Sequence, residues 1–273
     1  MSWKSILVHI RAYQDAQPAV DAAIALASTF DARLTGLYTV RELAMLKLVV
    51  GQSHSAVREA EARDQPLVQK AEARFREACE RAGITASFDT AEGNASEVLC
   101  MAGRSHDLMV IEQSVSGLDS LGIDSAEECV VAAGTPTLMV PKSRTAEHIG
   151  KTVVVAWNNS RQSASALHGA LPLIGKAEKV VVLLGEDRDT LPSITKRPKV
   201  DIEAYMKLHA KSVRVAPFTE GGDGASLQAA AIAAGGDVLV MGAYGRSTWR
   251  EFLFGGATRD VMQDLKLPVL MAH

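Results

Sequence analysis

Two short runs decide the fold of this chain: ILVHI at residues 6–10 and VVVAW at residues 153–157. Each is almost continuously apolar, which is the pattern of a strand buried on both faces of a parallel sheet. Each also follows a polar pair, Lys-Ser in the first case and Lys-Thr in the second. The recurrence predicts that the chain is built from two similar halves.

The later parts of the two halves carry matching signals at a constant spacing. Three residues recur 130 positions further on, so that Ala95, Ser96 and Asp107 correspond to Ala225, Ser226 and Asp237. Each half then closes with an apolar run that contains a proline, TPTLMV at 135–140 and LPVLM at 267–271. A fixed spacing of this kind is typical of duplication. We predict two tandem domains, 1–142 and 150–273, with the polar stretch 141–150 as the linker.

Apolar runs and helical patterns alternate within each half. Strands are expected in the first half near 5–11, 34–40, 85–90, 107–112 and 136–140, and helices near 16–29, 54–82, 94–103 and 121–132. The second half has expected strands near 152–157, 179–185, 212–218, 237–242 and 268–272, and helices near 161–174, 200–209, 223–234 and 256–265. Strands joined by helical crossovers form a parallel sheet with right-handed connections. The predicted fold class is therefore α/β, with two tandem doubly wound five-stranded parallel sheets.

The two proline-containing runs suggest how the halves could pack. Proline has no N–H to donate, so Pro136 and Pro268 suit the start of a strand or the edge of a sheet. If each run closes its own sheet, the two edge strands could pair with each other. This hypothesis predicts that the two domains pack as an internal pseudo-dimer.

Composition excludes several classes of function. The 273 residues are 47% hydrophobic, enough for a packed core, and 29 basic against 32 acidic residues leave a net charge of −3. A general binder of nucleic acid or of an anionic membrane needs a basic excess, so we expect neither partner. No run approaches the ~18 apolar residues of a membrane span, and no apolar signal-peptide core follows the first residues. We expect a cytoplasmic protein.

The cysteines and histidines give no catalytic or metal site. The three cysteines, Cys79, Cys100 and Cys129, are scattered without a CxxC pair, which argues against a disulfide framework and a structural zinc site. The seven histidines show no HExxH arrangement, and no GxSxG elbow or Walker-type phosphate loop is present. We therefore assign no catalytic residue and no metal ligand.

The segment that carries chemistry is MGAYGRSTWREFLFGGAT at 241–258. Gly242 and Gly245 stand where a strand is expected to end, and Gly255 and Gly256 stand where the next helix is expected to begin. Glycine lets backbone N–H groups approach an anion closely, and a helix N-terminus adds unpaired donors. Thr258 can add a hydroxyl, and two arginines of the segment, Arg246 and Arg250, add positive charge. The pattern predicts an anion site at the carboxyl ends of the strands, although a two-glycine turn by itself is an ordinary loop.

The spacing Gly242-x2-Gly245-x9-Gly255, with Gly256 and Thr258 close behind, resembles the nucleotide motif of the universal stress protein family. The resemblance covers essentially the whole chain in tandem form. It implies an adenine-nucleotide alpha-hydrolase-like fold, dimers or pseudo-dimers, and binding of ATP or another adenine nucleotide, which Mg²⁺ can accompany. It also implies that these five residues surround the phosphates.

Further positions carried over from the family are less specific. Asn158 matches an aspartate that family members often have near the adenosine, although Asn158 or Ser160 could simply cap the following helix. The adenine is usually held by backbone groups at the end of the second strand, here around Leu184. Tyr244 and Arg246 join the candidate contacts as neighbours of the glycines. Gly256 stands where the family usually has Ser or Thr, so one hydroxyl contact is lost.

The first half lacks this constellation. At the same spacing of 130 positions, Glu112 replaces Gly242 and Val115 replaces Gly245. A carboxylate repels a phosphate, and valine does not readily adopt the backbone angles of glycine. We predict that the first half binds no nucleotide in this way and that its role is structural or directed to another ligand.

Three functions follow from these observations. The leading one is a stress-linked binding or regulatory protein that holds an adenine nucleotide in its second half, with at most slow ATP hydrolysis, as a homodimer or with a protein partner that the sequence does not identify. The alternative is an interaction scaffold that has lost nucleotide binding, which Asn158 and Gly256 would fit. A nucleotide hydrolase or ligase would need an SGGxDS-like loop after a first strand, and neither half has one.

Overall fold

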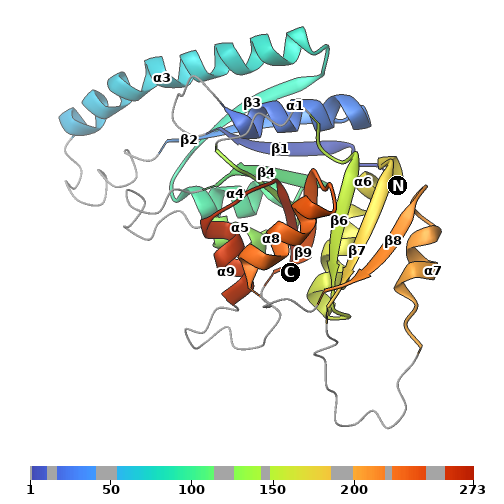
Figure 1. Cartoon of the computed structure of the whole chain (residues 1–273). Helices are drawn as coiled ribbons and strands as arrows, with labels where there is room; N and C mark the ends of the chain where they lie inside the picture. The colour runs from blue at the N-terminus through green and yellow to red at the C-terminus, as the bar shows by residue number, and fades with distance from the viewer. Residues whose placement is uncertain are drawn as a thin grey trace. The chain divides into compact units, whose positions relative to one another are not determined.

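A computed structural model describes residues 2–10, 17–40, 54–113, 126–142, 148–185, 199–218, 223–243 and 256–273. The chain divides into two compact units, Ser2–Glu147 and His148–His273 (Figure 1). Each unit alternates strands and helices along the chain. The α/β fold class and the tandem organisation predicted from the sequence are confirmed, whereas the pairing of the two units as a pseudo-dimer stays a prediction.

The first unit begins with an apolar strand followed by its covering helix. Its strands are β1 (Ser5–Ile10), β2 (Arg33–Val40), β3 (Ala86–Glu92), β4 (Leu108–Glu112) and β5 (Thr137–Val140). Its helices are α1 (Pro18–Phe30), α3 (His54–Arg81), α4 (Ala95–Gly103) and α5 (Ala126–Ala132). These bounds lie within a few residues of the predicted ones, except that the first residues expected for α5 lie outside the described ranges.

The second unit repeats this order. Its strands are β6 (Thr152–Trp157), β7 (Lys179–Leu184), β8 (Val213–Pro217), β9 (Val238–Gly242) and β10 (Val269–Ala272). Its helices are α6 (Arg161–Lys176), α7 (Ile202–Lys207), α8 (Gly224–Ala233) and α9 (Gly256–Gln263). All five strands and four helices predicted for this half are therefore confirmed in type and place.

The strands of each unit form a parallel sheet with its first strand in the middle. The order is β3-β2-β1-β4-β5 in the first unit and β8-β7-β6-β9-β10 in the second. In β1, Ile6 pairs with Leu34 on one side and Leu108 on the other; Val153 of β6 pairs in the same way with Val180 and Val238. Because both neighbours are strands, these two positions are completely buried, which explains why the runs that decide the fold are apolar throughout.

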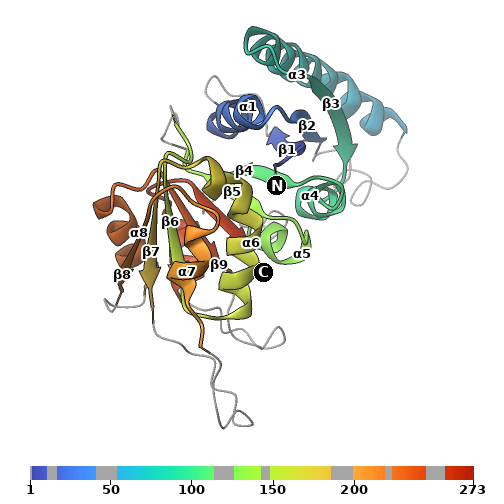
Figure 2. The same cartoon turned by 90° about the vertical axis from the view of Figure 1, so that its right-hand side faces the viewer.

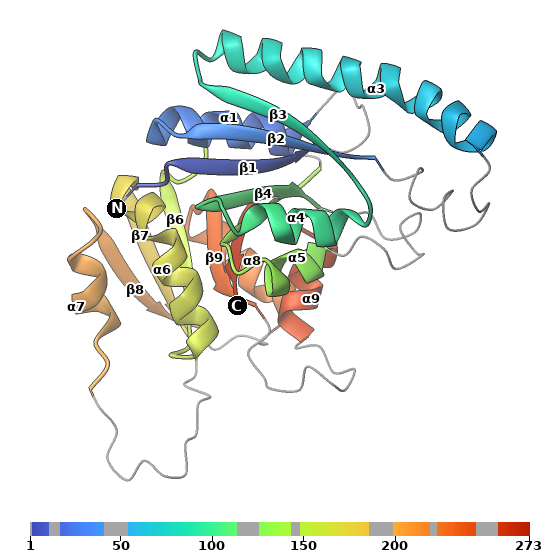
Figure 3. The same ribbon diagram turned by 180° about the vertical axis from the view of Figure 1, so that it is seen from behind.

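The helices cover both faces of each sheet. In the first unit α1 packs on α3 and α4 packs on α5, and Figure 3 shows the two pairs on opposite sides of the strands. In the second unit α6 packs on β6, β9 and β10, whereas α8 packs on α9 and β9. Figure 2 shows α6 and α8 on opposite sides of this sheet. Right-handed crossovers produce this arrangement, because the chain runs outward from the central strand and then returns past it.

Short polar side chains fix the beginnings of several helices. Asn94 caps α4, Ser160 caps α6, Asp201 caps α7 and Asp223 caps α8, each by accepting a hydrogen bond from the backbone N–H three residues later. At Asp223 the hydrogen bonds from Ser226 hold the pKa of the carboxyl below its ordinary value. Side-chain oxygens at these positions satisfy N–H groups that the first turn of a helix leaves without an intrahelical acceptor.

The aspartate that recurs before the fourth strand ties that strand to the first one. Asp237 Oδ1 accepts from the backbone N–H of Gly150 at 2.8 Å, and its Oδ2 accepts from Lys151 and Thr152 at 2.9 and 3.1 Å. In the first unit the same device recurs, since Asp107 Oδ2 accepts from the N–H groups of Lys4 and Ser5 at 2.6 and 3.0 Å. The carboxylate therefore explains why this residue is retained in both halves.

We expect Asp237→Ala to lower the free energy of unfolding of the second unit by about 1–2 kcal/mol, because three backbone N–H groups lose their acceptor. Those of Lys151 and Thr152 lie nearer to solvent than that of the buried Gly150 and can bind water instead. Chemical denaturation followed by far-UV circular dichroism measures the loss. Asp260→Ala, at an exposed position of α9, is the control for the removal of one charge. Equal unfolding midpoints for the two variants would contradict the assignment.

In the part of the chain that the structure describes, no helix has both the length and the apolar character needed to cross a membrane. The three cysteines are free and buried. Burial raises the pKa of the Cys79 thiol to about 11, with a smaller contribution from the charge of Glu80, and burial also raises the pKa of Cys129. Neutral buried thiols of this kind are poor nucleophiles, so they serve as core residues.

Candidate functional site at the carboxyl edge of the second sheet

The candidate site lies where the strand order of the second sheet reverses. From β6 the chain proceeds through α6 to β7 and β8 on one side, and through α8 it returns to β9 on the other side of β6. The carboxyl ends of β6 and β9 are therefore neighbours whose connections lead away in opposite directions. Ligands of doubly wound sheets bind outside the strands at such a point.

Gly242 ends β9 in direct contact with the first turn of α6. A Cβ atom at this position would lie 2.5 Å from the carbonyl carbon of Gln162 and 2.6 Å from the backbone nitrogen of Ser163. Both neighbours are main-chain atoms, so a side chain could be admitted only by moving the helix. The glycine predicted to cradle a phosphate is thus required here by the approach of a helix to a strand.

Asn158 follows β6 and is tied to the start of α6. Its Oδ1 accepts from the Ser160 hydroxyl at 2.7 Å and from the Ser160 N–H at 3.3 Å. Ser160 in turn accepts from the N–H of Ser163 at 3.2 Å, which makes Ser160 the N-cap of the helix. Of the two alternatives left open by the sequence, Ser160 is the cap, and Asn158 supports it from two residues earlier.

Ala243, directly after Gly242, is held on both sides by the end of β10. Its N–H donates to Ala272 O at 3.0 Å, and its carbonyl oxygen lies 3.0 Å from His273 Nδ1. Because a carbonyl only accepts, Nδ1 is the protonated nitrogen of this imidazole. The Nε2 of His273 then faces the Arg161 guanidinium at 3.5 Å. This places a positive side chain at the same edge of the sheet, at the first residue of α6.

The end of β7 has part of its backbone already engaged. Leu184 has a 41% exposed side chain, and its carbonyl oxygen accepts from Phe218 N–H at 2.8 Å. The N–H of Gly185 donates to Trp157 O, also at 2.8 Å. The backbone around Leu184 was expected to contact an adenine. Such contacts would have to use backbone groups other than the Leu184 carbonyl and the Gly185 N–H, which these two hydrogen bonds already occupy.

A second close glycine contact fixes the beginning of α9. A Cβ atom on Gly224 would lie 2.5 Å from the carbonyl oxygen of Ala257 and 2.6 Å from the backbone nitrogen of Val261. The first turn of α8 therefore touches the first two turns of α9. Gly256 is the first residue of α9, as predicted, and Thr258 lies in this first turn with only 6% of its surface exposed.

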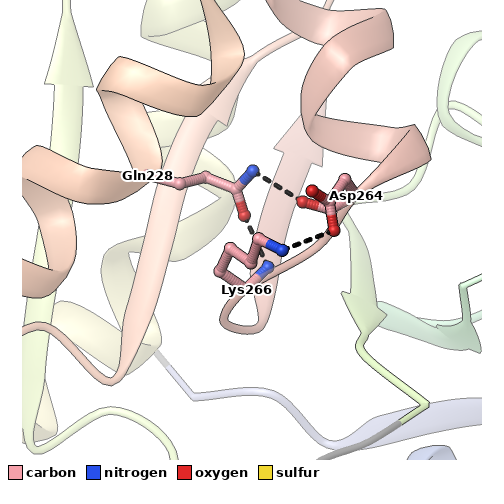
Figure 4. A network of polar contacts seen from close by, with 3 residues as sticks. All are labelled: Gln228, Asp264 and Lys266. Atoms are coloured by element: carbon pink, nitrogen blue, oxygen red, sulfur yellow. Dashed lines mark hydrogen bonds and ion pairs between the residues drawn. The ribbon is translucent and has the colours of Figure 1, made fainter.

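The other end of α9 is held by Gln228, which is buried on α8. Its Nε2 donates to Asp264 O at 2.9 Å, and its Oε1 accepts from Lys266 N–H at 2.7 Å (Figure 4). Lys266 and Asp264 also form an ion pair at 2.7 Å through well-exposed side chains. One amide thus satisfies two backbone groups in the turn between α9 and β10.

Four predicted site residues lie outside the described residues: Tyr244, Gly245, Arg246 and Gly255. The segment that contains them, 244–255, joins Ala243 to Gly256. The structure fixes its two ends by the contacts just given. Gly242 and Asn158 both contact the beginning of α6, whereas Leu184 lies one strand further along the sheet. Within the described ranges, no group of three or more His, Cys, Asp or Glu side chains could hold a metal ion.

The same place in the first unit has different chemistry. Glu112 ends β4 as Gly242 ends β9, and each pairs with the strand that closes its sheet, at Val140 and Ala272 respectively. The correspondence expected from the sequence between these two positions is therefore confirmed by their places in the two sheets. A carboxylate stands where the second unit has a bare backbone. Val115, the other replacement, lies outside the described residues.

Sequence reasoning did not select Arg161, Gln162, Ser163 or His273 as site residues. The signal for the first three is their place directly after the expected end of a strand, in the turn that carries ligands in this fold class. His273 has no such signal, because its contact with Ala243 depends on the pairing of β9 with β10.

A family model for universal stress proteins matches residues 2–141 and 150–273, which together make up nearly the whole chain. The chain belongs to the universal stress protein family. The two matches show that this universal stress protein has two tandem repeats, as the spacing of the aspartates and prolines predicted. Among curated proteins, no significant relative was found.

Solved structures support the same fold for this universal stress protein. A universal stress protein from Archaeoglobus fulgidus is similar over 98% of this chain and 95% of its own, with a TM-score of 0.71 and 14% identity. A functionally unknown protein from Pseudomonas aeruginosa is similar over 99% of this chain and 92% of its own, with a TM-score of 0.60 and 16% identity. At such identities the likeness concerns the fold.

Proposed function

We propose that the second domain, residues 150–273, binds ATP or another adenine nucleotide at the carboxyl edge of β6 and β9. The observation that carries the proposal is the contrast between the two repeats. The same point of the sheet has Gly242, the start of α6 and Asn158 in the second repeat, but Glu112 in the first. A helix N-terminus and the nearby Arg161 favour an anionic ligand, whereas a carboxylate opposes one.

In this proposal the glycines of 242–256 and Thr258 surround the phosphates, and Tyr244 and Arg246 belong to the same contact segment. Asn158 and the backbone near Leu184 would contact the adenosine. Mg²⁺ would be brought by the nucleotide, with its free coordination sites filled by phosphate oxygens and water. The first domain, residues 1–142, would be structural.

We further propose that binding, rather than turnover, is the role of the site in a cytoplasmic, stress-linked regulatory protein, with a protein partner or a second copy as its target. Among the described residues around Gly242 and Asn158, no contact identifies a side chain that would act as a general base. Hydrolysis of the bound nucleotide would accordingly be slow.

One observation favours the alternative of an interaction scaffold without nucleotide. The packing of Gly242 against Gln162 and Ser163 requires a glycine whether or not a ligand is present. Retention of Gly242 is therefore compatible with a protein that uses this edge only as structure. The two functions predict different results for the replacement of Gly245: only a nucleotide-binding protein would lose affinity for ATP.

The test is isothermal titration of the full chain with ATP, for the unchanged protein and for Gly245→Val. We expect one nucleotide per chain for the unchanged protein and at least a tenfold weaker affinity for the variant, because a β-branched side chain hinders the close approach of backbone donors to phosphate. Ala229→Val, at an exposed position of α8, is the control for an added β-branched side chain. Absence of binding at millimolar ATP would favour the scaffold, and two nucleotides per chain would refute the structural role of the first domain.

A further inference from the structure

The orientation of the Asn158 carboxamide is fixed by a group that can only donate. The backbone N–H of Ser160 points at one of its two terminal atoms at 3.3 Å, so that atom must be the oxygen. The Ser160 hydroxyl reaches the same oxygen at 2.7 Å. The side-chain nitrogen of Asn158 therefore faces away from the helix.

Ser160 can make this contact only as a donor. Its hydroxyl oxygen already accepts from the N–H of Ser163 at 3.2 Å, and its one hydrogen has a shorter contact with Asn158 Oδ1, at 2.7 Å, than with the Ser163 hydroxyl, at 3.3 Å. The hydrogen bonds run in one direction, from the α6 N-terminus through Ser160 to Asn158. Bonds arranged in this way polarise one another, and the positive end of the helix dipole adds to the effect. Withdrawal of electrons from Oδ1 makes the N–H groups on Nδ2 stronger donors.

From this arrangement we infer that Asn158 determines specificity as a hydrogen-bond donor, so that the site selects a nucleoside through an acceptor atom placed opposite Nδ2. The inference rests on the proposed function, because it concerns the same site. Among the described residues Nδ2 has no hydrogen-bond partner, and Asn158 Cβ lies 3.8 Å from the position that a Cβ on Gly185 would take, at the shared edge of β6 and β7. The acceptor of the ligand is a ring nitrogen of the base, because a ribose hydroxyl could donate to an aspartate as readily as it accepts from Asn158.

An aspartate at 158 would present the opposite polarity. Its shape is nearly that of asparagine, so one oxygen could keep both contacts with Ser160. The second oxygen would then take the place of Nδ2 and would accept where Asn158 donates, with a negative charge in addition. Asn158→Asp is for this reason a substitution that changes the chemistry towards the ligand while leaving the support from α6 in place.

The first experiment measures the affinities of the unchanged protein, Asn158→Ala and Asn158→Asp for ATP and for adenosine. Loss of one donor predicts about tenfold weaker binding of both ligands by the alanine variant. The aspartate variant should bind adenosine at least as weakly as the alanine variant does. Adenosine is included because it has no phosphates, so charge repulsion does not enter the comparison. Asn94→Asp, at the N-cap of α4 in the first unit, is the control for the added charge.

Analogues that each lack one acceptor identify the atom opposite Nδ2. We expect one of 1-deaza-ATP, 3-deaza-ATP and 7-deaza-ATP to lose about tenfold affinity with Asn158 present and to lose nothing further in the alanine variant, which is the coupling expected of a direct pair. If Asn158→Asp binds adenosine as tightly as the unchanged protein or more tightly, the inference is wrong although the proposed function stands. If the unchanged protein binds no ATP, the proposed function itself has failed.

A second readout needs no ligand. In the nucleotide-free protein, the Nδ2 hydrogens of Asn158 should exchange with water at the rate of a free carboxamide, as measured by NMR on selectively labelled asparagine. Ser160→Ala should shift this resonance by removing the polarising contact, and Ser160→Thr should restore it. Slow exchange of these hydrogens in the unchanged protein would overturn the inference, because it would mean that the protein already holds the donor.

Discussion

Gly242→Ala is expected to destabilise the second unit by about 3 kcal/mol, the upper part of the range for a forced increase in volume inside a packed region. The new methyl group would lie 2.5 Å from the carbonyl carbon of Gln162 and 2.6 Å from the nitrogen of Ser163. No side chain can rotate away to relieve this contact, because the neighbours are backbone atoms. The strand and the helix must separate, and the hydrogen bond from Ser163 to Ser160 lies at the place where they do so.

Denaturation monitored by circular dichroism and by tryptophan fluorescence checks the expected loss, since Trp157 ends the neighbouring strand β6. Gly175→Ala is the matched control: it lies in α6, where the added methyl would meet His209 O at an ordinary 3.7 Å, and alanine is the better helix former. We expect the control to be neutral or slightly stabilising. A Gly242→Ala protein as stable as the control would show that the helix moves aside at no cost.

Gln228→Leu should have the second largest effect, a loss of about 2–4 kcal/mol. The side chain is 2% exposed, and its amide satisfies Asp264 O and Lys266 N–H at 2.9 and 2.7 Å. Leucine has a similar volume but offers no hydrogen bond, so two backbone groups would be left without partners in a part-buried turn, at about 1–2 kcal/mol for each. Retaining the volume separates this cost from that of a cavity.

The matched control for this substitution is Gln69→Leu, at an exposed position of α3. The ion pair next to Gln228 provides a second comparison, because Lys266 and Asp264 have 56% and 70% exposed side chains. Removing it by Lys266→Ala should change stability by less than about 1 kcal/mol. If Lys266→Ala were as harmful as Gln228→Leu, the stabilisation would belong to the ion pair and not to the amide. Thermal denaturation of the three variants decides between them.

The sequence predicted most of the fold because its strongest signals are local. The buried runs around Ile6 and Val153 identify the central strands by hydrophobicity alone, and the recurrence of Asp107 as Asp237 aligns the two repeats. The physical role of that aspartate was not predicted, since the N–H groups that donate to it lie more than 80 residues away in each repeat. A spacing in the sequence shows that a residue recurs, whereas its partner depends on the strand order.

The candidate site was predicted less completely for the same reason. Gly242 was selected for its ability to expose backbone, and the structure adds a contact with α6 that requires glycine independently. Gln228 gave no signal, because a glutamine in an alanine-rich helix has the pattern of a surface residue. Its burial depends on the turn after α9 folding back towards α8, which no periodicity within α8 could indicate.

Asp107 and Asp237 hydrogen-bond to the beginning of the first strand in their respective repeats. The residues that stabilise the sheet are therefore separate from the residues that could contact a ligand. Each repeat carries its own fastening at the amino ends of the strands, while the differences between the repeats are found at the opposite, carboxyl ends. Substitutions at the carboxyl ends, such as glutamate at 112, could thus accumulate without breaking the hydrogen bonds that hold the first strand. The first repeat is on this ground a ready host for an engineered pocket, because residues at one rim can be exchanged without disturbing the anchorage at the other.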